Sequence, residues 1–288
     1  MELNTLLQYK PYSTARTEKR ALYAGLLTEL TQFHREHCPE YGRLLDALGC
    51  PAHMDCTVEN TPMLPVSLFK ELELRSIPEG EVFKTITSSG TTGQRVSRIF
   101  LDGATSACQQ QALCQIMSDF LGERRLPFLV LDSRQVLRNR AMFSARGAGI
   151  LGFSIFGTRP CYALDEHMEL DLDGVRAFLE EHQGETIFLF GFTFMIWKHV
   201  VRALEERGER LDIPNGILVH GGGWKKLAGE AVSPGEFKAR VAAATGVERV
   251  SNYYGMAEQT GCIYMECPQG HLHASLWSDI VVRRGRDY

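Results

Sequence analysis

The stretch TITSSGTTGQRVSRIF, residues 85 to 100, sets a loop of small polar residues between two strand-like runs. Its centre, Ser88 to Gly93, offers four hydroxyls and two glycines, and Arg95 and Arg98 follow closely. Glycines let a backbone approach phosphate closely, while hydroxyls, N–H groups and a nearby cation stabilise its charge. A flexible surface linker has the same composition, so composition alone leaves both interpretations open. The loop lacks the G-x-x-x-x-G-K-[ST] pattern of P-loop NTPases.

Strand-like and helical patterns alternate after this loop. A helix is expected from about Thr105 to Leu121, and further helical segments separate short β-rich runs. These runs are PFLVLD, TIFLF, GILVH and RVSNYY. Such alternation is typical of parallel strands joined by crossover helices, so the predicted fold class is α/β.

Two further helices are well marked. Residues 17–37 repeat apolar side chains at spacings of three and four, which predicts an amphipathic helix. Ser233, Pro234 and Glu236 supply an N-cap, a first-turn proline and a capping-box acid, and Gly246 can end that helix.

The composition excludes several classes of partner. The chain has 288 residues, 44% hydrophobic and 23% charged, with a net charge of -4, so no general basic field favours nucleic acid or anionic membranes. The apolar runs are too short to span a membrane and the N-terminus lacks a signal-peptide pattern, which favours the cytoplasm. The eight scattered cysteines are therefore expected to be reduced thiols.

Two motifs carry a family resemblance. SSGTTG resembles the phosphate-binding loop of the adenylate-forming superfamily, and YYGMAEQTG, Tyr253 to Gly261, resembles its second signature, Y-G-x-[TSA]-E. The segments LPVSLFK, SSGTTGQRVSRI, FSARGAGILGF, FGFTFMIW, HGGGWKKL and YGMAEQTGCIYMEC together resemble LuxE-type acyl-protein synthetases, which are relatives of phenylacetate-CoA ligases. The resemblance extends from about Ala21 to the end of the chain.

The resemblance implies that ATP and a carboxylic acid, expected to be a fatty acid, give an acyl-adenylate, and that the acyl group then passes to a protein thiol. It implies that Glu258 holds Mg²⁺, that Arg98 neutralises phosphate charge, and that Tyr254, followed by Gly255, lies against the adenine. The residues implied in nucleotide binding are Ser88, Ser89, Gly90, Thr91, Thr92, Gly93, Gly221, Gly222, Gly223, Tyr254 and Gly255.

The chain departs from the family pattern at three points. Val96 stands where many relatives carry a lysine, so Arg95 or Arg98 is expected to supply the charge. Ala257 replaces a hydroxyl residue before the glutamate. The ribose-binding aspartate, the mobile C-terminal domain and the acyl-accepting cysteine of the family would lie beyond Tyr288.

The expected architecture is therefore the large N-terminal domain of an adenylate-forming enzyme, with mixed or parallel sheets flanked by helices and without the small C-terminal domain. Residues 1–80 are expected to form a helical segment packed on the main domain, and residues 81–288 the nucleotide-binding core. The implied partners are the acid and an acyl-acceptor protein such as a fatty-acid reductase. A CoA ligase of the phenylacetate type, or an adenylate-binding protein without turnover, remains as an alternative.

A second cluster suggests zinc. Cys262, Cys267, His271 and His273 bring four thiol or imidazole ligands together in the sequence, although their spacing matches no common zinc finger. Cys262 is also the first candidate for a covalent acyl carrier, against the alternative of a small buried side chain.

The remaining histidines near the motifs have a simpler interpretation. The chain has no G-x-S-x-G motif of a serine hydrolase. His199 and His220 are therefore interpreted as hydrogen-bonded structural residues.

Overall fold

The computed structural model describes residues 6–88, 95–138 and 145–284. The chain forms two compact units and passes between them more than once. The first unit comprises Met1–Ile116, Gly255–Ile263 and Ala274–Tyr288, and the second comprises Met117–Tyr254 and Tyr264–His273. The division into residues 1–80 and 81–288 stays a prediction of the sequence.

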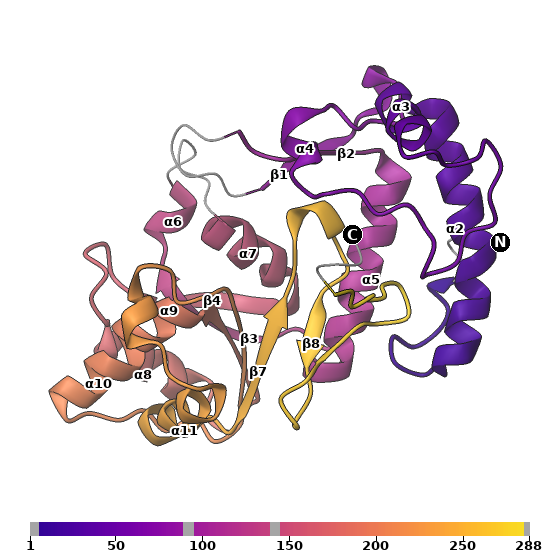
Figure 1. Cartoon of the computed structure of the whole chain (residues 1–288). Coiled ribbons are helices and arrows are strands. Elements are labelled where there is room, and N and C mark those ends of the chain that lie inside the picture. Colours follow the sequence, from indigo (N-terminus) through magenta and orange to yellow (C-terminus); the bar gives the residue numbers. More distant parts are fainter. Residues whose placement is uncertain (1–5, 89–94, 139–144, 285–288) are drawn as a thin grey trace. The chain divides into compact units, whose positions relative to one another are not determined.

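The second unit is built on a sheet of seven strands in the order β4-β3-β5-β6-β7-β8-β9 (Figure 1). The strands β3 to β7 pair in parallel, whereas β8 and β9 are antiparallel additions. The strands are β3 (Leu126–Ser133), β4 (Gly157–Leu164), β5 (Ile187–Phe192), β6 (Gly216–Gly221), β7 (Arg249–Tyr254), β8 (Tyr264–Glu266) and β9 (Leu272–His273). The four β-rich runs predicted from the sequence are β3, β5, β6 and β7, so the α/β class is confirmed.

Helices cover both faces of this sheet. The chain runs from β3 through α7 to β4, and then back across the sheet through α8 to β5. These two steps along the sheet have opposite directions, and both crossovers are right-handed, so α7 and α8 lie on opposite faces (Figure 1). The helices of this unit are α6 (Gln135–Arg138), α7 (Ala145–Phe153), α8 (Leu172–Glu181), α9 (Thr193–Ile196), α10 (Arg202–Arg207) and α11 (Pro234–Thr245). Shorter turns are η3 (Ser154–Phe156), the π-helical η4 (Trp197–Val201) and η5 (Lys225–Glu230).

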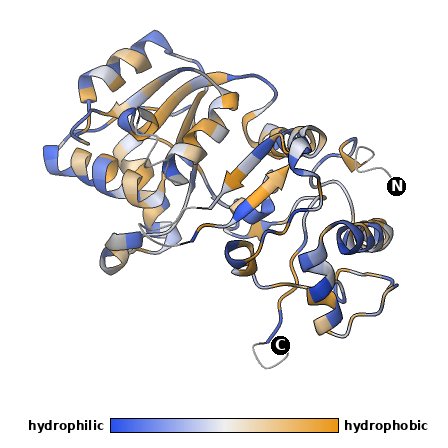
Figure 2. Ribbon diagram, turned by 90° about the horizontal axis from the view of Figure 1, so that it is seen from above, coloured by the Kyte–Doolittle hydropathy of each residue, from blue (hydrophilic) through white to orange (hydrophobic). Residues whose placement is uncertain are grey.

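The core of the second unit is aromatic on the face that α7 covers. The rings of Phe128 and Phe188 stack at 4.9 Å, and Phe153 of α7 stacks on Phe190 at 4.4 Å. Figure 2 shows hydrophobic strands between helices whose outer sides carry hydrophilic residues. The strands β3, β5 and β6 are buried almost throughout, which is why they read as continuous apolar runs.

The boundaries of α11 follow the predicted signals. The Ser233 Oγ accepts a hydrogen bond of 3.2 Å from the Glu236 N–H, and Pro234 is the first helical residue. The helix ends at Gly246, whose φ of 75° is left-handed and suits glycine.

The first unit is mainly helical. Its helices are α2 (Arg16–His37), α3 (Pro39–Ala47), α4 (Leu68–Glu71) and the part of α5 (Gly103–Leu121) up to Ile116, with the short turns η1 (Glu79–Glu81) and η6 (Ala257–Gln259). The two strand-like runs around the Ser/Thr/Gly loop form an antiparallel pair, β1 (Lys84–Thr87) and β2 (Arg98–Leu101). The amphipathic helix predicted at residues 17–37 is confirmed as α2.

Residues 275–279, near the end of the described chain, contact the Lys19 side chain of α2. Lys19 is 8% exposed, and its Nζ donates hydrogen bonds to the Ser275 carbonyl at 2.9 Å and to the Ser278 carbonyl at 2.5 Å. The Asp279 carboxylate lies 3.7 Å from the same Nζ. Desolvation by burial lowers the pKa of Lys19, and the attraction of Asp279 opposes this. No helix among the described residues is long and apolar enough to cross a membrane.

Candidate functional site

Ser88 and Ser97 join the two ends of the Ser/Thr/Gly loop by hydrogen bonds. The Ser88 N–H donates to the Ser97 carbonyl at 3.2 Å, and the Ser97 N–H donates to the Ser88 Oγ at 2.9 Å. Ser88 therefore fixes the loop ends, and its hydroxyl hydrogen makes no hydrogen bond to any residue that the structure describes. The other predicted phosphate ligands, Ser89, Gly90, Thr91, Thr92 and Gly93, lie outside the described residues.

The turn that carries Glu258 packs beside the strand that leaves this loop. Within the first unit, η6 contacts β2. The Thr260 Oγ1 donates to the Ala257 carbonyl at 2.5 Å, which closes the turn. A Cβ on Gly261, whose φ is 83°, would lie 2.5 Å from the Gln109 carbonyl of α5, so only glycine permits this close packing. The fold thus holds the glutamate motif against the strand that follows the loop.

Glu258 itself is half-buried, and it makes no hydrogen bond or ion pair within the parts of the chain that the structure describes. A carboxylate without a protein cation suits Mg²⁺, which is usually held by one or two carboxylates together with substrate phosphates. The residue present therefore fits the implied metal.

Both candidate arginines have acidic neighbours in the first unit. Arg95 Nη1 lies 2.7 Å from Glu71 Oε2, and Arg98 Nη2 lies 3.7 Å from Glu73 Oε2. The Arg98 guanidinium also lies 5.8 Å from the centroid of the Phe100 ring. Exposed ion pairs contribute little to stability, so either arginine can exchange its carboxylate for a phosphate at small cost.

The three glycines after β6 have different structural explanations. A Cβ on Gly221 would lie 2.5 Å from Cε1 of Tyr253. Gly222 has a φ of 76°, and a Cβ there would lie 2.9 Å from Cδ1 of Phe192. A Cβ on Gly223 would meet nothing within 4 Å, which leaves room for an approaching ligand. The first two glycines are thus explained by packing, and Gly223 is the one with open space.

Thr193 and His220 form hydrogen bonds that hold the turn of Gly221 and Gly222 after β6. The Thr193 hydroxyl donates its hydrogen to the Gly222 carbonyl at 2.9 Å, and the hydroxyl oxygen lies 2.9 Å from His220 Nδ1. Because the hydroxyl hydrogen is already used, His220 Nδ1 carries a hydrogen and donates it to the Thr193 oxygen. Burial lowers the pKa of His220 to about 3, so the ring is neutral. His199 Nδ1 likewise lies 2.9 Å from the Met168 carbonyl. Both histidines are hydrogen-bonded as the sequence interpretation held.

The end of β7 presents its two tyrosines differently. The ring of Tyr253 packs on Phe153 at 5.0 Å, and burial raises the pKa of this tyrosine to about 12. Tyr254 is 52% exposed, with Tyr264 at 6.1 Å as its aromatic neighbour. Strand alternation therefore leaves the ring of Tyr254 available for stacking, and Gly255 after it is exposed too.

An ion pair between a buried aspartate and a partly exposed arginine at the end of β3 was not predicted. Asp132 is fully buried, its Oδ2 lies 3.1 Å from Nε of Arg146 in α7, and its Oδ1 accepts from the Ser133 N–H at 2.7 Å. Burial raises the pKa of Asp132, while Arg146 and the Ser133 N–H oppose the shift. The pair lies where the chain reverses direction across the sheet, between β3 and β5, a position at which open α/β sheets bind ligands.

The proposed zinc ligands do not gather into a metal site. Within residues 6–88, 95–138 and 145–284, which include all four, no three His, Cys, Asp or Glu side chains come together to hold a metal ion. The Cys262 Sγ instead donates to the Trp277 carbonyl at 3.5 Å, and burial raises the pKa of this thiol to about 11. Cys267, His271 and His273 lie in the β8–β9 hairpin, where the Cys267 N–H donates to the His271 carbonyl.

Solved structures show which class of fold this is. The structure of 2-hydroxyisobutyryl-CoA ligase, in the postadenylation state in complex with R3-HIB-AMP, matches with a TM-score of 0.57 at 16% identity, over 90% of this chain and 54% of that one. At this identity the likeness shows the fold alone, which is that of adenylate-forming ligases. This chain spans about half the length of that ligase.

Two other structures match more weakly. The amide bond synthetase McbA from Marinactinospora thermotolerans has a TM-score of 0.39 at 15% identity, over 67% of this chain and 33% of that one. An NRPS protein containing adenylation and PCP domains has a TM-score of 0.37 at 17% identity, over 80% and 37%. These scores are too low to support an argument.

The sequence also matches a family. The model of the LuxE acyl-protein synthetase family covers residues 2–287, so the chain belongs to this family. Comparison with curated proteins gives no match.

Proposed function

We propose that this chain activates a carboxylic acid with ATP and Mg²⁺ to an acyl-adenylate and then supports transfer of the acyl group to a protein thiol. The observation that carries the proposal is the packing of η6 against the strand β2 that leaves the Ser/Thr/Gly loop. Glu258 in η6 has no hydrogen bond or ion pair with any residue that the structure describes. The family supports the reaction type, and the acid is expected to be a fatty acid.

The chemistry requires a better leaving group on the acid. A carboxylate acylates poorly, whereas its adenylate releases AMP readily, and catalysis consists mainly of positioning the carboxylate at the α-phosphate and neutralising charge. Mg²⁺, when bound, neutralises the triphosphate charge as pyrophosphate leaves.

Each predicted residue has a defined task in this proposal. Hydroxyls and N–H groups of Ser88 to Gly93 bind the β- and γ-phosphates, and Glu258 is the protein ligand for the metal. Arg98 leaves Glu73 to meet a phosphate. Gly223 gives the nucleotide room, and Tyr254, next to Gly255, stacks on the adenine.

ATP–pyrophosphate exchange tests the activation step. With a panel of fatty and aryl acids, exchange is expected without CoA, and Glu258→Gln should lower it by about 100-fold because a charged metal ligand is lost. Glu123→Gln, an exposed carboxylate in the second unit, is the matched control and should leave exchange unchanged. Equal exchange by Glu258→Gln and the unaltered protein would contradict the assignment.

Radioactive acid then identifies the acceptor. Label on a protein thiol, for example of a fatty-acid reductase, supports the acyl-protein route. Label on CoA supports the alternative of a CoA ligase. Nucleotide binding without exchange supports the non-catalytic alternative. The abundance of ATP and Mg²⁺ in the cytoplasm makes it the expected compartment.

A further inference from the structure

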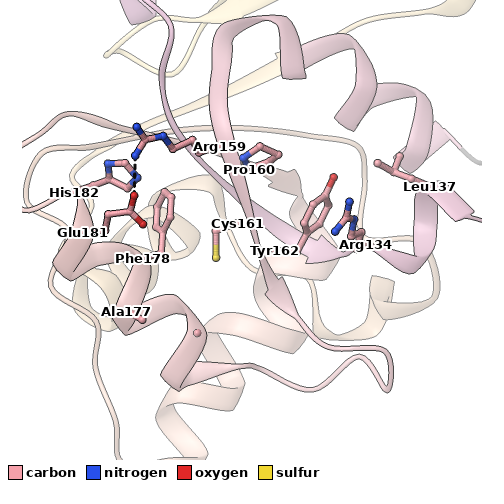
Figure 3. A pocket seen from close by; sticks show the side chains of 11 residues that line it. Arg134, Leu137, Arg159, Pro160, Cys161, Tyr162, Ala177, Phe178, Glu181 and His182 are labelled. Atoms are coloured by element: carbon pink, nitrogen blue, oxygen red, sulfur yellow. Dashed lines mark hydrogen bonds and ion pairs between the residues drawn. The ribbon is translucent and has the colours of Figure 1, made fainter.

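A pocket of about 600 Å³ lies in the second unit, where the edge strand β4 meets α8 (Figure 3). This volume is in the range of small-molecule sites, which are largely apolar with a few polar groups. Figure 3 shows Arg159, Glu181 and His182 at one side of the pocket, and Arg134 and Tyr162 at the other. Between them lie the side chains of Cys161, Ala177 and Phe178.

This pocket is separate from the predicted nucleotide residues of the same unit. Gly221 and Tyr254 end the strands β6 and β7, whereas β4 is separated from β6 by β3 and β5. At about 4.8 Å per strand, three steps across the sheet amount to roughly 14 Å. The proposed acid activation therefore does not account for the pocket.

The backbone beside the pocket is strained. Arg159 has a φ of 45°, which is disfavoured for any residue other than glycine, and its Nη1 lies 2.7 Å from Glu181 Oε1 across the pocket rim. Pro160, which follows, has no N–H to offer to another strand. The edge of β4 is thus unsuited to strand pairing, and the pocket is more suited to a ligand held by side chains.

The wall also contains a polar atom without a partner. His182 is 5% exposed, and its Nδ1 lies 2.8 Å from Glu185 Oε1. Its Nε2 is buried and has no hydrogen-bond partner among the described residues. Buried polar atoms are nearly always paired, so this one indicates a partner that does not belong to the described chain.

The charge at the two ends of the pocket differs. Arg159 is neutralised by Glu181, whereas Arg134 is exposed and has no ion-pair partner in the described ranges. The Arg134 charge acts on the Tyr162 hydroxyl, opposing the burial that raises the pKa of this tyrosine. Cys161 is uncharged, because burial raises the pKa of its thiol to about 11. The Asp132 carboxylate also acts on Tyr162, but it is paired with Arg146, so the unpaired charge at this end of the pocket, among the described residues, is that of Arg134.

We propose that this pocket binds a small organic anion, with its carboxylate or phosphate group at Arg134 and Tyr162 and its apolar body on Cys161, Ala177 and Phe178. A carboxylate and a phosphate ester share the acceptor oxygens that an arginine and a hydroxyl recognise. The site is independent of ATP and of the proposed acid activation.

Isothermal titration calorimetry of the whole chain, without ATP, tests the proposal with benzoate and phenyl phosphate as probes and benzyl alcohol as the uncharged comparison. At least one anion is expected to bind saturably and at least tenfold more tightly than the alcohol. Whichever anion binds identifies the preferred charged group. If neither binds, or if the alcohol binds equally well, the proposal is wrong.

Variants locate the binding. Ala177→Trp fills the pocket and should abolish binding, whereas Glu180→Trp, on the same helix outside the lining, should not. Arg134→Gln should weaken anion binding about tenfold or more, whereas Arg176→Gln, which loses only its pair with Glu209, should not. Circular dichroism establishes that each variant is folded, and the exposed Arg134→Gln carries the test if Ala177→Trp misfolds. Unchanged affinity in Arg134→Gln would refute the site.

Discussion

The glycine that ends β6 offers a sharp test of the packing beneath the proposed nucleotide site. In Gly221→Ala the added methyl would lie 2.5 Å, 2.8 Å and 2.9 Å from ring atoms of Tyr253. That ring has little freedom to move, because it packs on Phe153 at 5.0 Å and on Phe190 at 6.2 Å. Overpacking of this kind costs about 1–3 kcal/mol. At about 3 °C per kcal/mol, the melting temperature should fall by roughly 3–9 °C.

Gly223→Ala is the matched control, because a methyl there meets no atom within 4 Å. Differential scanning calorimetry of the two variants should show a clear fall for Gly221→Ala and a change within about 1 °C for Gly223→Ala, as for surface substitutions. ATP–pyrophosphate exchange should instead be impaired in Gly223→Ala, since the methyl occupies the space proposed for the nucleotide. Equal melting temperatures for the two variants would refute the packing argument.

Three further substitutions probe other parts of the chain. Because burial holds the pKa of His220 at about 3, below its unfolded value near 6.5, the stability that this residue contributes is complete above pH 6.5 and falls by about 1.4 kcal/mol per pH unit below it. The difference in melting temperature between the unaltered protein and His220→Gln should therefore narrow from pH 7 to pH 4, and a constant difference would contradict this. Glu258→Gln should leave the melting temperature within about 1 °C while exchange falls by about 100-fold, since its carboxylate has no partner in the described chain; a large fall in melting temperature would indicate a structural role. Lys19→Met removes the hydrogen bond to the Ser278 carbonyl, whereas the Ser275 carbonyl still accepts from the Ser278 N–H, so the free energy of unfolding in urea should fall by about 1–3 kcal/mol. The exposed Lys10→Met should leave the urea midpoint unchanged, and equal midpoints for the two variants would contradict the prediction.

Local signals in the sequence predicted much of the fold. The strands β5 and β6 are buried on both faces, so each appears as an uninterrupted apolar run. The helix α11 was predicted together with its ends, because capping depends on neighbouring residues such as Ser233. The strand β4 was missed, since GTRPCYAL contains a proline and an arginine that only an edge strand accepts.

In the candidate site, the sequence pointed to the residues of the two signature motifs but not to the side chains that support them. The contact of η6 with β2 agrees with the expectation that the glutamate motif and the loop act together. Thr193 and the pair of Asp132 with Arg146 carried no signal, because a polar residue at a strand end is common and its partner is set by tertiary packing. The joining of late segments of the chain to early ones in the first unit also carried no local signal, because it is set by tertiary packing.

The hydrogen bonds of Lys19 with Ser275 join residues 256 positions apart, which has a consequence during translation. At about 5–20 residues per second, a ribosome needs roughly 13–50 s to reach the second residue after making the first. During this time the Lys19 ammonium group of α2 lacks the carbonyls of Ser275 and Ser278 that accept its hydrogen bonds in the folded protein. Helix α2 of a nascent chain is thus a site at which a chaperone would be expected to act.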